Sequence, residues 1–161
     1  MTSEHEAKVV GRNLQVSTKQ VIEIANQIRG KNLIKTKQML ERVVKKQLAI
    51  PYRRFNMDTG HRKGKMGPGR YPVKASKEIL MLLESLEANA QNKGLDVDTL
   101  YIRTIIPNKG NTVWHYGRHR RRQAKTTHIE IIAEEKEEEK KITKKIEKKE
   151  EKKTEEKKEE K

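Results

Sequence analysis

The apolar side chains of this chain are confined to short stretches with helical or strand periodicity, and long charged segments separate them. Only 32% of the 161 residues are hydrophobic and 38% are charged, so any core formed by these stretches must be small. A chain of this length fits one domain with an appendage better than two full domains. The apolar pattern therefore limits the fold to one small packed body with large charged extensions.

Two stretches in the first third of the chain have the apolar spacing of short amphipathic helices. The first covers residues 18–29, with Ser17 placed to cap its start and Gly30 to end it. The second is expected to begin at a cap formed by Thr36. It should stop before Pro51, because proline lacks an amide donor and disfavours helix in the residue before it.

A longer third helix and three strands complete the expected body. The helix begins at Pro72 and ends before Gly94, with an apolar stripe of Ile79, Leu80, Leu83, Leu86 and Ala90. Alternating apolar residues predict strands at residues 9–16, 96–106 and 128–133. Their inward faces are expected to be Val10, Leu14 and Val16; Leu100, Ile102 and Ile106; and Ile129, Ile131 and Ala133. This pattern predicts an α+β fold in which three helices pack on a small three-stranded antiparallel sheet.

Two basic segments do not fit this packed body. The first, residues 49–72, which we call the basic loop, contains glycine and proline among many cations and is expected to be functional or disordered. The second, residues 107–127, which we call the arm, joins the last two strands and is far longer than a normal hairpin turn. Its simplest geometry continues both strands outward as a long extended β-hairpin.

The charge of the chain is concentrated in these segments. The 12 Lys and 12 Glu of residues 134–161 cancel, so the whole net charge of +15 belongs to residues 1–133. The basic loop and the residues just after it carry seven cations and one acid, Asp58, and the arm carries six cations and no acid. These cations are Arg53, Arg54, Arg62, Lys63, Lys65, Arg70 and Lys74 for the loop, and Lys109, Arg118, Arg120, Arg121, Arg122 and Lys125 for the arm.

An excess of this kind indicates a polyanionic partner. Five of the six aromatic residues lie in or beside the same segments: Tyr52, Phe55, Tyr71, Trp114 and Tyr116. Arginine suits phosphate oxygens and aromatic rings stack on unpaired bases, so the pattern favours nucleic acid, with an anionic membrane surface as the alternative. RNA is favoured over DNA because the sequence has no helix-turn-helix, zinc-finger or basic-zipper signature.

No arrangement of residues indicates catalysis, a metal site or a cofactor. The chain has no cysteine, and His115 and His119 lie in the arm without an acidic partner, so we expect them to face RNA. Asp96 and Asp98 are expected to shape the entry to a strand. No apolar run approaches the roughly 20 residues needed to span a bilayer. We predict a protein that is not an enzyme, with no cofactor, no small-molecule substrate and no membrane partner.

The last part of the chain is a Lys/Glu-rich run with two apolar side chains, Ile142 and Ile146. Such a segment cannot bury enough surface to offset the entropy lost on ordering. We therefore expect an RNA-binding domain, residues 1–133, followed by a low-complexity tail, residues 134–161.

Four blocks of the sequence resemble a known family in order and in spacing. The family is the universal large-subunit ribosomal protein whose hairpin lines the nascent-peptide exit tunnel, number twenty-two in the bacterial count. The second block resembles an insertion found in its archaeal and eukaryotic branch, and the match runs from about Lys8 to Ala133. The blocks are GRNLQVSTKQVIEIANQIRGK, IPYRRFN…GRYPVKAS, ESLEANAQNKGLDVDTLYI and YGRHRRRQAKTTHIEII.

This resemblance implies the same fold as the apolar pattern, and it also implies partners and site residues. The hairpin would thread through large-subunit ribosomal RNA beside neighbouring ribosomal proteins, and its tip would contact the nascent peptide in the exit tunnel. The protein would support assembly in the large subunit, in the cytoplasm. The tip would consist of Trp114, His115, Tyr116, Gly117 and Arg118, with Gly117–Arg118 matching a Gly-Arg pair common in the family. The expected RNA-binding residues are the cations named above, with Arg12, Trp114, His115, Tyr116 and His119.

Two rival functions remain at this stage. A free-standing nucleic-acid chaperone or regulator could use the same basic surface, and sedimentation of cell extract would separate it from a ribosomal protein. A nuclease or other phosphoryl-transfer enzyme would need an acidic cluster that binds metal. Only the pair Asp96 and Asp98 offers a starting point for one.

Overall fold

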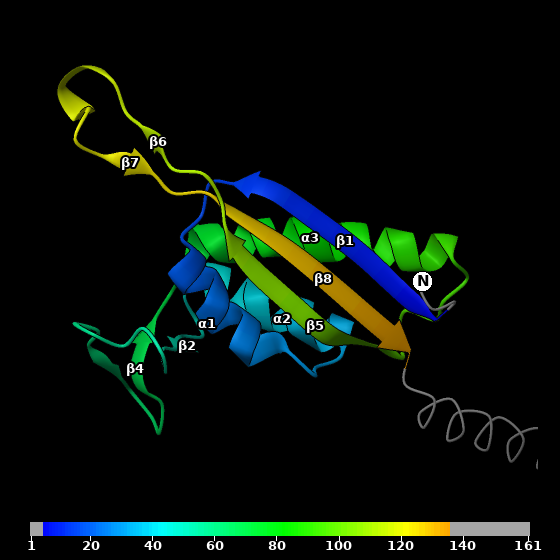
Figure 1. Cartoon of the computed structure of the whole chain (residues 1–161). Coiled ribbons are helices and arrows are strands. Elements are labelled where there is room, and N and C mark those ends of the chain that lie inside the picture. Colours follow the sequence, from blue (N-terminus) through cyan, green and yellow to red (C-terminus); the bar gives the residue numbers. More distant parts are fainter. Residues whose placement is uncertain (1–4, 136–161) are drawn as a thin grey trace, which may run out of the picture.

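The computed structural model describes residues 5–135, in which three helices cover one face of a three-stranded antiparallel sheet (Figure 1). The sheet has the order β1–β8–β5, with strands β1 (Glu6–Leu14), β8 (Thr127–Glu135) and β5 (Leu100–Lys109). The helices are α1 (Thr18–Ile28), α2 (Leu33–Val44) and α3 (Val73–Asn92). This is the predicted α+β fold. Strand β8 includes the first two residues of the Lys/Glu-rich tail, whose remainder lies outside the described residues.

The core lies between the sheet and the helices. Along the central strand β8 the predicted inward residues Ile129, Ile131 and Ala133 face the helices and are buried, and Thr127 continues the same face. The helices contribute Ile24, Ile28, Leu40, Ile79, Leu83 and Leu86. Helix α3 packs closely over β1 at Gly11, where an added Cβ atom would lie 2.9 Å from both Cδ atoms of Leu82.

The buried face of β1 differs from the prediction. Ala7 and Gly11 face inward, whereas Val10 is 45% exposed on the opposite face. Two of the inward positions carry small residues and the third, Val9, is only partly buried against the core, so apolar size did not reveal the face. Beyond Gly11 the pairing with β8 shifts, and Asn13 has a φ of 54°. This irregularity changes the alternation and leaves Val16 buried, as predicted.

Strand β5 reverses its faces for a related reason. Leu100 and Ile102 are buried as predicted, but Ile105 is buried at 1% exposure and Ile106 is 40% exposed. The pairing with β8 shifts between Ile102 and Thr104, which places an extra residue in β5. A simple alternation of residues cannot anticipate such a bulge, so the prediction for Ile106 was wrong.

Helix α2 has different ends from those predicted. Asn32 caps it, with its Oδ1 accepting hydrogen bonds from two amides of the first turn at 2.9 and 3.4 Å. Thr36 lies one turn inside the helix, where its buried hydroxyl donates to the Asn32 carbonyl at 2.8 Å. The helix ends at Val44, near Lys46 with a φ of 58°, so Pro51 does not stop it.

The other helix ends agree better with expectation. Helix α1 covers the predicted residues, and Gly30 follows it with a φ of 74°. Ser17 occupies the N-cap position without a side-chain capping bond, so the predicted capping by Ser17 is wrong. Helix α3 follows Pro72, and Gly94 lies just beyond its end with a φ of 70°.

Both basic segments contain regular structure. The basic loop forms a small sheet of order β2–β4–β3, with β2 (Ile50–Pro51), β4 (Gly67–Arg70) and β3 (His61–Arg62). In the arm, β6 (Val113–Trp114) pairs with β7 (Gln123–Ala124), and a short 3-10 turn, η1 (Gly117–His119), lies between them. Figure 1 shows the arm projecting beyond the sheet, with the basic loop at the same end of the molecule.

Candidate nucleic-acid interface

A buried carboxylate positions the start of the basic loop. Glu23 on α1 is 1% exposed, and its two oxygens accept hydrogen bonds from three successive backbone amides. The amides are those of Arg53, Arg54 and Phe55, at 3.1, 2.9 and 2.6 Å. Hydrogen bonds to an ionised acceptor are stronger than neutral ones. Glu23 therefore fixes the backbone from which two arginine side chains extend, a role that the sequence analysis did not anticipate.

The aromatic residues of the basic loop contact cations of the chain itself. Phe55 has the Lys19 ammonium 5.4 Å and the Arg54 guanidinium 5.3 Å from its ring centre, and Arg62 lies 5.1 Å from that of Tyr71. Such contacts restrict the cations to positions over the rings. Each of these rings therefore helps to hold a cation in place.

Tyr52 belongs to the core. Its side chain is 5% exposed, and within residues 5–135 its hydroxyl has no hydrogen-bond partner. Burial raises the pKa of Tyr52, against a smaller lowering by Arg70. Tyr52 therefore anchors the basic loop to the core and does not offer a surface for base stacking.

Two arginines of the basic loop also stabilise its small sheet. Arg62 Nε donates to the Gly69 carbonyl at 3.1 Å, and Arg70 Nη2 donates to the Asp58 carbonyl at 3.1 Å. An Arg guanidinium has five N–H donors, so each side chain keeps several for a ligand. The two arginines can therefore hold the loop together and still bind phosphate.

A basic groove connects the loop to the root of the arm. One cavity, of about 310 Å³, lies between α1 and the loop; a second, of about 360 Å³, lies between α1 and the arm. The first is lined by Ser17, Lys19, Gln20, Tyr52, Arg54, Phe55, Met57, Thr59, Arg70 and Lys125. The second is lined by Ser17, Thr18, Lys19, Lys109, Thr112, Gln123, Lys125 and Thr126. Ser17, Lys19 and Lys125 line both cavities, so together they form one groove, which no acidic side chain lines.

The N-terminus of α1 lies in this groove. Its first turn contains no acidic residue, and Ser17 leaves the free amides uncapped. The free N–H groups and the dipole of a helix N-terminus favour negative charge. The helix therefore adds to the field of the five cations that line the groove, which are Lys19, Arg54, Arg70, Lys109 and Lys125.

The arm presents its side chains to solvent. At its root, Gly110 is buried and its amide donates to the Thr126 carbonyl at 3.0 Å. Farther out, the His115 amide donates to the Arg122 carbonyl at 2.9 Å. Trp114 is 60% exposed and Tyr116 is 93% exposed. These are the aromatic residues of the arm, and both are free to stack on an external partner.

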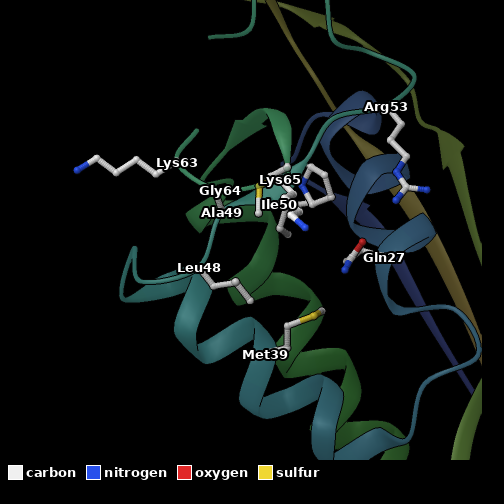
Figure 2. Close-up of a pocket in the computed structure, with 11 residues that line it drawn as sticks. Gln27, Met39, Leu48, Ala49, Ile50, Arg53, Lys63, Gly64 and Lys65 are labelled. Carbon is white, nitrogen blue, oxygen red and sulfur yellow. The ribbon is translucent and has the colours of Figure 1, made fainter. Parts of the chain in front are cut away.

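The predicted RNA-binding residues fall into four places. The groove contains Arg54, Arg70, Lys109 and Lys125. A separate pocket on the other side of the basic loop contains Arg53, Lys63 and Lys65 (Figure 2). The outer arm carries the exposed residues Trp114, His115, Tyr116, Arg118, His119, Arg120, Arg121 and Arg122. Arg12 on β1, Arg62 on β3 and Lys74 on α3 are exposed outside these cavities.

The prediction missed Lys19, which lies at the centre of the groove. The available signal was a first helical turn that carries a lysine and lacks any acid, against the usual preference for acidic residues there. Within residues 5–135, none of the ion pairs involves a cation of the basic loop or the arm. These cations are therefore available to an anionic partner.

The acidic residues near the sheet are used structurally. Asp96 Oδ1 accepts the Asp98 amide at 3.1 Å, which forms the predicted turn before β5. In the described part of the chain, no three His, Cys, Asp or Glu side chains are grouped so that they could hold a metal ion. No helix between residues 5 and 135 is long and apolar enough to cross a membrane.

Fold and site together define a small basic α+β protein whose surface suits a polyanion. Residues 9–134 match the family described as ribosomal protein L22p/L17e. The chain is 41% identical over 145 residues to the large ribosomal subunit protein uL22 of Methanopyrus kandleri, covering 84% of this chain and 91% of the relative. It is 44% identical over 144 residues to that of Nanoarchaeum equitans, covering 83% and 82%.

The chain therefore belongs to the ribosomal protein L22p/L17e family. A further relative, uL22 of Ignicoccus hospitalis, is 42% identical over 144 residues, which are 83% of this chain and 91% of the relative. These archaeal relatives confirm both the predicted family and its archaeal type. They are ribosomal proteins rather than enzymes, in agreement with the predicted absence of catalysis.

Proposed function

We propose that this chain is a structural constituent of the large ribosomal subunit and binds its ribosomal RNA through the groove, the basic loop and the arm. It supports assembly of the subunit and contacts neighbouring ribosomal proteins. Residues 1–133 form the RNA-binding domain, and residues 134–161 form an appended tail. Its place of action is the ribosome in the cytoplasm.

One observation carries this proposal. The groove and the arm hold a continuous set of cations from separate elements, and in residues 5–135 no carboxylate pairs with any of them. Like charges held close together destabilise a compact state unless a polyanion compensates them. RNA phosphates supply that compensation, and the released counterions add to affinity.

The tip of the arm is the proposed contact with the exit tunnel. Residues 113–123 are all exposed, and Gly117 with a φ of 63° allows the tight turn at η1. Trp114, His115, Tyr116, Gly117 and Arg118 would face the tunnel and the nascent peptide. A photoreactive amino acid at Tyr116 of the full chain, incorporated into ribosomes, should crosslink to nascent chains or to tunnel RNA. Crosslinks confined to solvent-side proteins would contradict this placement.

Salt-dependent binding to large-subunit ribosomal RNA tests the RNA-binding role. The full chain should lose affinity steeply as salt rises. Replacing Arg120, Arg121 and Arg122 with alanine should reduce the slope of log K against log salt by about 0.7–0.9 for each lost phosphate contact. A loss of about 2.1–2.7 in the slope would mean that all three arginines contact phosphate.

The matched control removes the same charge elsewhere. Lys35, Lys45 and Lys77 are exposed on or next to α2 and α3, outside the cavities and the arm. Their triple alanine variant should keep most of the slope. Equal losses in both variants would show a diffuse dependence on net charge, and an unchanged slope in the arm variant would exclude phosphate contact by the arm.

A further inference from the structure

A second cavity on the basic loop has a different chemistry from the groove. It has a volume of about 400 Å³, within the range of small-ligand pockets, and lies between the basic loop and helices α1 and α2. Its apolar lining includes Met39, Leu48, Ile50 and Met66. Its polar lining includes Gln27, Arg53, Lys63 and Lys65, and no acidic side chain lines it.

Figure 2 shows how these groups are arranged. Gln27 from α1 and Arg53 from the basic loop point toward one another on one side, and Met39 from α2 and Leu48 from the segment after α2 lie on the other. Lys63 extends away from the cavity. The cavity therefore has an apolar wall opposite a polar edge, with cations at its rim.

The Gln27 amide is available to a ligand. The residue is half-buried on α1, and among residues 5–135 its side chain makes no hydrogen bond. A glutamine amide presents a donor and an acceptor side by side. That pair matches the polar edge of a nucleobase, whereas a phosphate group offers acceptors alone.

We propose that this cavity, which we call the base pocket, receives one unpaired RNA base. The apolar wall formed by Met39 and Leu48 packs against the base, and the Gln27 amide pairs with its polar edge. Arg53 and Lys65 at the rim bind the flanking phosphates. This inference rests on the proposed RNA-binding function and adds base recognition to the phosphate binding of the groove.

The cationic rim and the donor–acceptor pair of the Gln27 amide favour a nucleotide over other occupants. An acidic peptide with one apolar side chain would also satisfy the wall and the rim. Such a peptide would offer the Gln27 amide only a backbone group as a hydrogen-bond partner. Peptide binding is therefore one of the outcomes of the test below.

Methyl NMR of the full chain tests the base pocket directly. The methionine methyl groups are observed during titration with AMP, GMP, CMP and UMP to about 10 mM, which detects millimolar affinity. Met39 and Met66 line the pocket and should shift with at least one nucleotide. Met81, which is 63% exposed and lines neither this pocket nor the groove, is the internal control. Ribose 5-phosphate, which lacks the base, should leave Met39 and Met66 unchanged.

Single variants separate base recognition from simple charge attraction. Gln27→Ala should lower the affinity for the preferred nucleotide about fivefold, because one hydrogen bond is lost. Lys65→Ala should also weaken binding, whereas Lys45→Ala removes the same charge from an exposed position outside the pocket and should have little effect. Equal loss in the two lysine variants would overturn the proposal.

Three other results would overturn the base pocket. They are an absence of shifts at Met39 and Met66, equal shifts with ribose 5-phosphate, and tighter binding of a Glu-Leu-Glu peptide. Filter binding of the same variants to large-subunit ribosomal RNA distinguishes the two proposals. If the wild-type chain binds that RNA with a steep salt dependence while any of these results holds, only the base pocket fails. If the chain does not bind that RNA, the proposed function itself fails.

Discussion

Replacement of Glu23 should loosen the basic loop more than any exposed acid would. The carboxylate accepts three amides in a row, those of Arg53, Arg54 and Phe55. Glu23→Ala leaves all three part-buried amides without that partner. Glu23→Gln keeps one acceptor oxygen but places an NH₂ group against an amide donor, which gives an intermediate loss.

The magnitude follows from the number of bonds and their exposure. A hydrogen bond to a charged group contributes about 1.5–3 kcal/mol. Partial solvation of the freed amides reduces the sum, so we expect Glu23→Ala to lower the free energy of unfolding by about 3 kcal/mol and Glu23→Gln by about 1.5 kcal/mol. Glu84→Gln is the matched control, because that side chain is exposed on α3 and should change stability by less than about 0.5 kcal/mol.

Urea unfolding of the full chain gives the stability, and native-state hydrogen exchange locates the effect. In Glu23→Gln the amides of Arg53, Arg54 and Phe55 should exchange faster, while those of β8 change only with global stability. Affinity for ribosomal RNA should fall several-fold as the loop cations lose their fixed positions. Unchanged exchange at these three amides would refute the role given to Glu23.

Three further changes test other parts of the fold. Gly110→Ala should disturb the arm root and lower RNA affinity, because its Cβ would lie 2.5 Å from Thr126 Oγ1 and 3.2 Å from the Thr126 backbone; binding equal to wild type would contradict this. Gly11→Ala should cost about 1–3 kcal/mol in urea unfolding, because the Leu82 side chain of α3 must shift away from a Cβ 2.9 Å from its Cδ atoms. A hydrogen bond to a carboxylate on β8 raises the pKa of Tyr101, so its stabilisation is complete below about pH 10 and is lost as the pH rises through the folded-state pKa. Tyr101→Phe should therefore unfold with a weaker pH dependence between about pH 9 and 11 than the wild type.

The helices and the central strand could be predicted because their patterns are local. Strand β8 alternates strictly, and α3 carries a regular apolar stripe. The faces of β1 and β5 could not be predicted in the same way. Two of the three inward positions of β1, Ala7 and Gly11, carry small residues, and a bulge in β5 moves Ile105 inward. Both features depend on a neighbouring element that a short sequence window does not include.

In the site, too, the features set by neighbouring residues in the sequence could be predicted, and those set by packing could not. Charge counting located the arm and the basic loop, because their cations lie close together in the sequence. It could not locate Lys19, which reaches the groove only because α1 packs between the loop and the arm. The roles of the aromatic residues also depended on packing. Tyr52 is buried and Phe55 is covered by cations, so the exposed rings of the arm remain for stacking.

In residues 5–135, paired charges lie at one end of the sheet and unpaired cations at the other. At the end where β1 begins and β8 ends, Arg103 pairs with Glu6 at 3.0 Å and with Glu134. At the opposite end lie the groove and the arm, whose cations have no acidic partner among residues 5–135. A charge distribution of this kind orients a protein as it approaches a polyanion. RNA would therefore be met by the arm first, and the neutralised end of the sheet would remain turned away from it.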